Sequence, residues 1–316
     1  MKSLMSIRSS LLFTLLTISF SCFAADQAEL NRELRNAASI DDDETLVVLL
    51  DAGADVDAAN QFGKTALMNA VENGNILTTS ILLSRGADVN KETIVGLTAL
   101  TFAAENGQVE LTALLLERGA NLETRTRSGL NALLLAAQYN QVEMVDQLLF
   151  KGADPNATDK DGRTALMIAA YRGHIGPVEL LIHSGASIRR VDSKGKTALI
   201  HAADSGNNPD VVDMLITQGA QINEPSPDGA TPLIWAAHSG NPEMVRTLLK
   251  HDADVNRQDD NGASALMEAV QANSEDSVSI LLEAGADKTL KNSDGKTALD
   301  LVIKEDNKEI QSLLSQ

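Results

Sequence analysis

A step of 33 residues repeats along most of this 316-residue chain, and it constrains the fold more than any local pattern does. One glycine series keeps this step with a single exception of 34 residues: Gly63, Gly96, Gly129, Gly162, Gly195, Gly229, Gly262 and Gly295. A second series precedes alanine and comprises Gly53, Gly86, Gly119, Gly152, Gly185, Gly219 and Gly285, with Asp252 where one glycine is missing. The period predicts a linear array of similar units, each of which contacts only its neighbours.

Residues 161–185 illustrate what one unit is expected to form. An Asp-Gly pair predicts a tight turn, and Thr164 is placed to cap the helix that follows. Leu and Ala then recur at a spacing that gives this helix one apolar face. Gly173 and Gly185 are expected to end a first and a second helix in the left-handed conformation, and Asn140 and Asn273 are suited to the same role in other units.

The unit pattern G-x-T-x-L-x-x-A-A, followed by L-L-x-x-G-A, resembles the ankyrin repeat. One unit keeps the Thr-Pro-Leu of that family at 231–233, whereas most units have Thr-Ala-Leu. The resemblance implies an all-α solenoid of about nine stacked helix pairs with β-hairpin or turn fingers. In the ankyrin family a His usually follows this Leu. Here the position holds Met68, Thr101, Leu134, Met167, Ile200, Ile234, Met267 and Asp300. We expect the apolar members of this set to be buried.

The period divides the chain into four parts. We expect a signal peptide at residues 1–24, an N-terminal capping helix pair at 25–60, seven ankyrin repeats at 61–292 and a C-terminal capping repeat at 293–316. Four acids from Asp41 to Glu44 are interpreted as a solvated helix start, with a cation site as the alternative. Polar residues from Lys304 to Glu309 suit the open end of an array.

The first residues have the order of a secretory signal. Lys2 and Arg8 precede an apolar run at 11–20, and small residues then lead to a predicted cleavage after Ala24. The prediction is a periplasmic or secreted protein with no membrane attachment after cleavage. The alternatives are a retained anchor and lipidation of Cys22, although Ser19 stands where a lipoprotein signal usually has Leu.

Charge and composition exclude several classes of function. The chain has 26 basic and 44 acidic residues, and loss of residues 1–24 removes two basic residues, which gives a net charge of -20. Such a chain lacks the basic footprint of a nucleic-acid binder. Cleavage also removes the one cysteine, Cys22, so disulfides, thiol catalysis and thiolate metal sites are excluded from the mature protein.

No catalytic, cofactor-binding or metal-ligating constellation is predicted. The five histidines lack metal-ligand spacing, and His201 and His238 are expected to be more exposed than the others. Trp235 lies inside a predicted helix beside two alanines, so a packing role is favoured over recognition. The chain is therefore not expected to be an enzyme.

The resemblance also implies a protein-binding surface, because ankyrin proteins bind through finger tips and the concave end of the first helix. Carried over unit by unit, the candidate residues are Phe62, Ile94, Val95, Leu97, Arg127, Leu130, Tyr139, Lys160, Arg163, Tyr171 and Arg172. The apolar tips are expected to face solvent, and Lys194 and Lys196 add to the positive charge of this face. The alternative is that neighbouring fingers pack on one another and bury some of the apolar tips.

These observations predict a monomeric, exported binding module that assists, protects or scaffolds a periplasmic protein. The resemblance to exported ankyrin proteins implies a role in assisting or protecting enzymes, including stress-related ones such as catalases. Two alternatives remain: an immunity or inhibitor protein whose acidic surface caps a basic toxic or hydrolytic enzyme, and an uncharacterised hydrolase.

Overall fold

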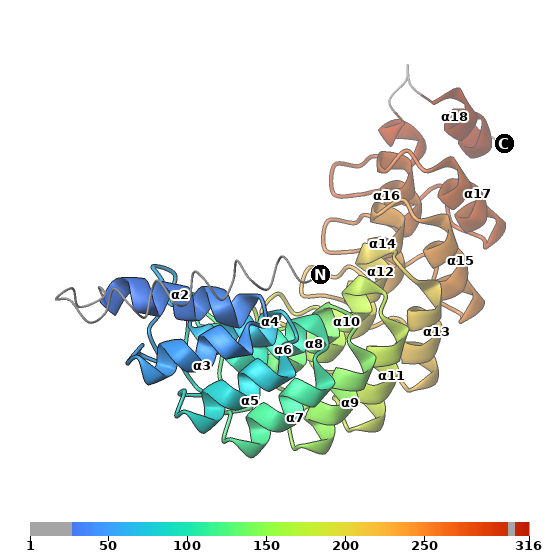
Figure 1. Ribbon diagram of the computed structural model, residues 1–316. Coiled ribbons are helices and arrows are strands. Elements are labelled where there is room, and N and C mark those ends of the chain that lie inside the picture. Colours follow the sequence, from blue (N-terminus) through green and yellow to red (C-terminus); the bar gives the residue numbers. More distant parts are fainter. Residues whose placement is uncertain (1–26, 303–306, 316) are drawn as a thin grey trace, which may run out of the picture. The chain divides into compact units, whose positions relative to one another are not determined.

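The computed structural model describes residues 27–302 and 307–315 of the chain. The predicted signal at 1–24, the cysteine at 22 and the polar residues Lys304 to Asp306 lie outside the described residues. The described part is all-helical, with seventeen α-helices and one 3-10 helix, and the predicted all-α array of stacked helix pairs is confirmed (Figure 1). None of these helices has both the length and the apolarity needed to cross a bilayer.

Each repeat contributes a first and a second helix. The first helices are α2 (Gln27–Ser39), α4 (Ala66–Glu72), α6 (Ala99–Asn106), α8 (Ala132–Gln138), α10 (Ala165–Arg172), α12 (Ala198–Ser205), α14 (Pro232–His238) and α16 (Ala265–Gln271). The second helices are α3 (Asp43–Asp51), α5 (Ile76–Ser84), α7 (Val109–Glu117), α9 (Val142–Phe150), α11 (Ile175–His183), α13 (Pro209–Thr217), α15 (Pro242–Lys250) and α17 (Glu275–Glu283). The last repeat has η1 (Leu299–Leu301) and α18 (Lys308–Ser315).

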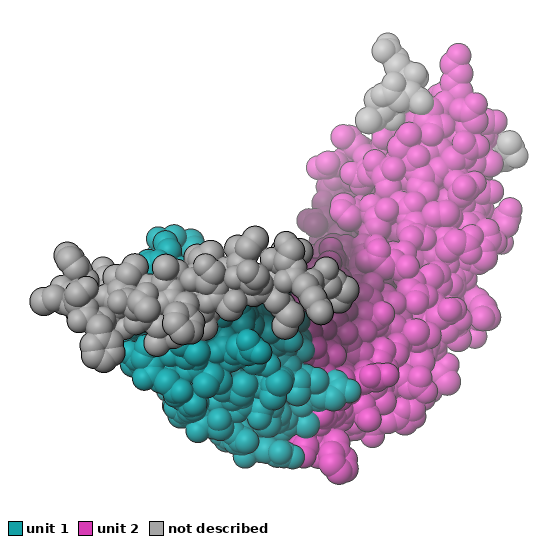
Figure 2. Space-filling view, in the orientation of Figure 1, with its two compact units in different colours: residues 1–103, 110–121 teal, residues 104–109, 122–316 magenta. Residues whose placement is uncertain are grey.

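The chain divides into two compact units, residues 1–103 with 110–121 and residues 104–109 with 122–316 (Figure 2). Within the second unit, each first helix packs on the first helix of the next repeat, from α8 to α16, and the second helices from α9 to α17 do the same. Within the first unit, α2 packs on α4 and α3 packs on α5. Stability in such a stack comes from contacts between neighbours.

Side chains at the helix starts and left-handed residues at the helix ends define the pairs. Thr164 Oγ1 accepts a hydrogen bond from Met167 N at 3.3 Å, which confirms the predicted cap of α10. Gly173 then ends α10 with φ +74°. Asn140 and Asn273 adopt φ +59° and +55°, so they replace glycine as predicted.

The fingers are turns and not β-hairpins. In the finger at residues 159–163, Asp159 Oδ1 accepts hydrogen bonds from the backbone N–H groups of Asp161 and Arg163 at 2.9 and 2.8 Å. Neighbouring fingers are joined by single bonds, such as Ser193 N to Asp161 O at 2.8 Å. Within single fingers, the described residues contain isolated bridges at 158–164 and 258–264, and they form no strand.

The core consists of thin layers of Leu, Ala, Val, Ile and Met between stacked pairs. Leu148 of α9 has no exposed surface. The substitutes for the family's His are buried as predicted, with Met167 at 1% and Ile200 at 0% exposure, whereas the polar Asp300 of the last unit is exposed. At the other end, Asp42 caps α3 by accepting from Thr45 N at 3.1 Å, which gives one of the four clustered acids a structural role.

Candidate binding hollow of the second unit

The predicted binding residues of the first unit are finger-tip side chains. Phe62, Ile94 and Val95 are 57%, 51% and 42% exposed. Two neighbouring tips meet through the backbone, since Ile94 N donates to Phe62 O at 2.9 Å. These three apolar side chains therefore face solvent in the first unit, although the backbones of Phe62 and Ile94 are hydrogen-bonded.

The expectation that Leu97 and Leu130 face solvent is wrong, because both are half-buried. Each follows a finger glycine, and its backbone oxygen closes the finger turn by accepting an N–H from four residues earlier. This position lies against the first helix of its own repeat. Leu97 packs on the core of the first unit, and Lys196 in the equivalent position bonds to Asp204 of α12 at 2.9 Å.

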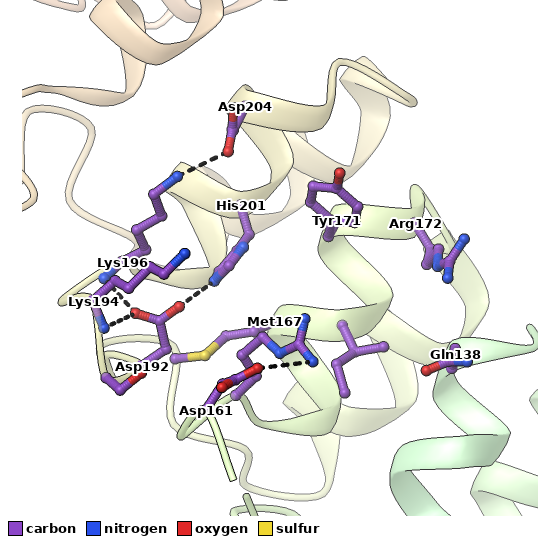
Figure 3. A pocket seen from close by; sticks show the side chains of 13 residues that line it. Gln138, Asp161, Met167, Tyr171, Arg172, Asp192, Lys194, Lys196, His201 and Asp204 are labelled. Atoms are coloured by element: carbon purple, nitrogen blue, oxygen red, sulfur yellow. Dashed lines mark hydrogen bonds and ion pairs between the residues drawn. The ribbon is translucent and has the colours of Figure 1, made fainter. Parts of the chain in front are cut away.

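A hollow of about 330 Å³ lies in the second unit over α10 and α12, beside the fingers at 159–163 and 192–196 (Figure 3). It contains three predicted binding residues, Arg163, Tyr171 and Arg172. The remaining lining residues are Gln138, Asp161, Met167, Ile168, Asp192, Ser193, Lys194, Lys196, His201 and Asp204. The predicted residues Arg127 and Lys160 are exposed on neighbouring fingers but do not line it, and Tyr139 directly follows the lining residue Gln138.

A buried pair holds one side of the hollow together. Asp192 Oδ2 lies 2.9 Å from His201 Nε2, and its Oδ1 accepts the backbone N–H groups of Lys194 and Lys196, both at 2.9 Å. The expected exposure of His201 is wrong, since only 9% of its surface is exposed. The ring of Tyr171 stands edge-on to the imidazole at 6.2 Å between centroids and helps to cover it.

The charge states of this pair follow from burial and hydrogen bonding. Burial raises the pKa of Asp192, but hydrogen bonds from the Lys196 backbone, the His201 side chain and the Lys194 backbone outweigh it and hold the pKa below its ordinary value. Burial lowers the pKa of His201 below its ordinary value, although the hydrogen bond and charge of Asp192 act in the opposite direction. At neutral pH the carboxylate is charged and the neutral imidazole donates its Nε2–H.

Two of the cations at the hollow are engaged by carboxylates. Arg163 contacts Asp159 Oδ2 through Nε at 2.8 Å and through a terminal nitrogen at 2.7 Å, and it lies 3.5 Å from Asp161. Lys196 is paired with Asp204 and also lies with Nζ 3.4 Å from the ring centroid of Trp235. The predicted concentration of positive charge is therefore partly neutralised within the repeat itself.

Arg172 and Lys194 differ from these two. Both are exposed, and neither forms an ion pair with a residue in the described ranges. Figure 3 shows Lys194 and Arg172 at opposite sides of the hollow, with Tyr171, His201 and Met167 between them. The hollow thus presents two unneutralised cations around a rim that also carries the half-exposed ring of Tyr171.

The tyrosine next to this hollow is neutral. Burial raises the pKa of Tyr139 above its ordinary value, and the charge of Glu105 and its hydrogen bond to the phenol add to the rise, whereas Gln138 and Arg172 act against it. Its side chain is 44% exposed. Tyr139 is therefore available as a neutral, hydrogen-bonding aromatic contact.

A smaller hollow of about 190 Å³ lies in the following repeat and is acidic, with Asp228, Asp259 and Glu268 in its lining beside His238. Trp235 stands in its wall. The indole is half-buried, its Nε1 donates to Ser226 Oγ at 3.1 Å, and one face carries Lys196. Its role is therefore partly packing, as predicted, and partly to hold a lysine of the neighbouring repeat.

Sequence reasoning missed the Asp192–His201 pair and the role of Asp204. A signal for Asp204 was present, because in two repeats a lysine after the finger glycine is followed by an acid eight positions later. Lys64 pairs with Glu72 at the same spacing as Lys196 with Asp204. No comparable signal marked His201, and no group of three His, Cys, Asp or Glu in the described part of the chain is placed to hold a metal.

Comparison with known families agrees with this architecture. A family model described as ankyrin repeats, in three copies, matches residues 34–126, 133–226 and 205–292. A search of curated proteins finds no match. Ankyrin repeats are protein–protein interaction modules, and the fold is typically a non-enzymatic scaffold. Because the matched segments span most of a chain built from stacked helix pairs, the chain belongs to the ankyrin-repeat family.

Proposed function

We propose that this chain is an exported protein that binds another protein of the same compartment through the hollow over α10 and α12, and that it assists, protects or scaffolds that partner. The observation that carries the proposal is the pairing of exposed Tyr171 and Arg172 beside the hollow. Tyr and Arg are the residue types that most often dominate binding energy at protein interfaces. Arg172 forms no ion pair within the described residues, and Tyr171 keeps 46% of its surface exposed although its ring also contacts His201.

The second step of the proposal is export. It rests on the amino-acid order of residues 1–24, where basic residues, an apolar run and small residues follow one another. A mature protein that begins at Ala25 has no cysteine, and it depends on helix stacking for stability in an oxidising compartment.

A binding role also fits the chemistry of the hollow better than hydrolysis does. His201 directs Nε2 to Asp192, and no hydroxyl of the described residues is hydrogen-bonded to this imidazole. Nucleophilic catalysis by serine or threonine requires such a contact. We therefore propose that the Asp192–His201 pair fixes the finger on α12 and has no catalytic role.

The net charge of -20 supports one variant of the proposed role. An acidic surface favours association with a basic partner, so a protein that inhibits a basic toxic or hydrolytic enzyme remains the second candidate. The identity and activity of the partner distinguish the two, because an inhibitor lowers the catalytic rate of its partner and a protecting protein preserves it under stress.

The test is affinity capture from a periplasmic extract with the mature chain as bait, beside a Tyr171→Ala/Arg172→Ala double variant. A matched control carries Ser293→Ala and Asp260→Ala, two exposed finger positions of later repeats. The proposal expects one protein that the wild type and the control retain and the double variant loses. Equal capture by all three chains, or capture of no protein, contradicts it.

A further inference from the structure

The hollow over α10 and α12 is lined by both cationic side chains and carboxylates. Whether it favours a negatively or a positively charged ligand depends on which of these groups already form ion pairs within the protein. The carboxylates of Asp161 and Asp204 face Arg163 and Lys196 at 3.5 and 2.9 Å. Asp192 is buried and receives two backbone N–H groups and the His201 ring. Asp192 and Asp204 are thus held by close partners, whereas Asp161 lies 3.5 Å from an arginine that is already paired with Asp159, and its side chain is 70% exposed.

The two cations that remain, Arg172 and Lys194, are exposed and have no ion-pair partner in the described ranges. Arg172 ends α10, and Lys194 lies in the finger that precedes α12. We propose that the hollow binds an acidic, extended segment of the protein partner through carboxylate side chains that reach Arg172 and Lys194. This inference deepens the proposed function and rests on the hollow being the contact site.

The arrangement favours a segment over a small ion. In Figure 3, Arg172 and Lys194 lie at opposite sides of the hollow, with Tyr171 and His201 between them. An extended chain places alternate side chains on the same face, about 7 Å apart, so one segment presents several acids to the two sides of the hollow. Tyr171 then lies against the backbone and the small side chains of the segment.

Apolar anchoring is weak in this hollow. Met167 and Ile168 line it but are 1% and 7% exposed, so they offer little apolar surface. Recognition consequently depends on hydrogen bonds to charged groups, which contribute more than neutral ones. Arginine also binds carboxylates through two parallel N–H groups, which adds a geometric requirement at Arg172.

The experiment uses fluorescein-labelled peptides of defined charge and measures their binding to the purified protein by fluorescence anisotropy at low salt. The first is acetyl-(Glu-Ala)4-amide, and the second is acetyl-(Gln-Ala)4-amide. A third has the second sequence with a free C-terminal carboxylate, so that side-chain and terminal carboxylates are distinguished. The expected result is a preference of about tenfold or more for the Glu peptide over both others.

Variants assign the preference to the hollow. Arg172→Gln/Lys194→Gln is expected to bind the Glu peptide as weakly as wild type binds the Gln peptide. The control Lys151→Gln/Arg257→Gln removes two exposed cations of the same unit that do not line the hollow, and it should retain the preference. Equal melting temperatures show that the folded state is the same in all three proteins.

The inference is overturned if the Glu and Gln peptides bind equally, if only the free-carboxylate peptide binds, or if both double variants lose affinity alike. Its failure is distinct from failure of the proposed function. If a partner is captured through Tyr171 but the peptides show no preference, the acidic segment is contradicted and the proposed function stands. If the Glu peptide is preferred but no partner is captured, the proposed function is contradicted and the preference of the hollow for acidic peptides stands.

Discussion

Lys196 and Trp235, from adjacent repeats, form a cation–π contact with Nζ 3.4 Å from the ring centroid, and the same ammonium is held by Asp204 at 2.9 Å. The contact couples the finger before α12 to the first helix of the next repeat. The charge of Lys196 is therefore neutralised within the protein, whereas Lys194, two residues earlier, has no ion-pair partner in the described ranges.

This contact gives an optical probe, because Trp235 is the one tryptophan of the chain. Lys196→Gln removes the cation from the indole face and is expected to change the emission of Trp235 and to lower stability by about 1 kcal/mol. Fluorescence spectra and urea unfolding measure both effects. Lys194→Gln, an exposed neighbour, should change neither, and an unchanged spectrum in Lys196→Gln contradicts the contact.

Truncation of a core leucine tests the stacking of the second helices. Leu148 is fully buried in α9, so Leu148→Ala is expected to cost about 2–5 kcal/mol of unfolding free energy through lost burial and a cavity. Phe150→Ala, in the same helix but 86% exposed, should be near neutral. Chemical denaturation of the two variants decides the matter, and a near-neutral Leu148→Ala would show the helix registration to be wrong.

The binding face is tested by single substitutions. Tyr139→Ala and Arg172→Ala remove exposed side chains, so their melting temperatures should hardly change, whereas Tyr171→Ala also removes the ring contact with His201 and should lower the melting temperature slightly. Each substitution is expected to weaken the affinity for a captured partner by about 1–4 kcal/mol. Calorimetric titration of partner into each variant measures the loss. Retention of full affinity by all three, with loss on changing Asp260 or Ser293, places the binding face elsewhere in the array.

The buried histidine makes stability depend on pH. Since the pKa of His201 is lower in the folded protein than the value of about 6.5 in an unfolded chain, the unfolded state takes up more protons as the pH falls through about 6.5. Stability therefore falls on acidification in that range and levels off below the folded pKa. Asp192, whose pKa is lowered, acts in the same direction further down, below about pH 4.

Unfolding curves between pH 5 and 8 measure this slope in wild type and in His201→Asn, which cannot titrate and should show a flatter profile in that window. His183→Asn, at an exposed position of α11, should keep the wild-type slope. A slope that is the same in His201→Asn and wild type contradicts the buried neutral imidazole.

Export is tested by the N-terminus of the mature protein. Protein recovered from outside the cytoplasm is expected to begin at Ala25, because small residues at 22 and 24 follow the apolar run. Intact mass and N-terminal sequencing report it directly. Recovery only in detergent, with Met1 or a lipidated Cys22 at the terminus, would indicate an anchor.

Much of the fold was predictable because its determinants are local and repeat at fixed spacing. The capping role of Thr164, the left-handed ends at Asn140 and Asn273, and the burial of Met167 each follow from the conformational preference or polarity of one residue type at a known place in the unit. Such features depend on contacts within a repeat or with the next one.

The hollow was predictable only in part, because its chemistry arises from pairings. The burial of His201 depends on Asp192 nine residues earlier and on the ring of Tyr171 in the preceding repeat. Likewise, the half-burial of Leu97 results from the turn geometry that directs its side chain to the first helix. Residue type alone places these side chains on a finger and does not show which way they point.

The position after each finger glycine has a consequence for how such an array changes in evolution. Its backbone closes the turn in each of these fingers, while its side chain is a lysine at 64, 196 and 296, a leucine at 97 and 130, an arginine at 163, and an alanine at 230 and 263. The turn is thus indifferent to the identity of that side chain. One codon per 33 residues can therefore alter the polarity beside the first helix while the finger turn is kept, and the cost to the scaffold is limited to the contacts of one side chain, such as those of Leu97 or Lys196. Binding preference can diverge repeat by repeat in this way while the backbone of the fold is inherited.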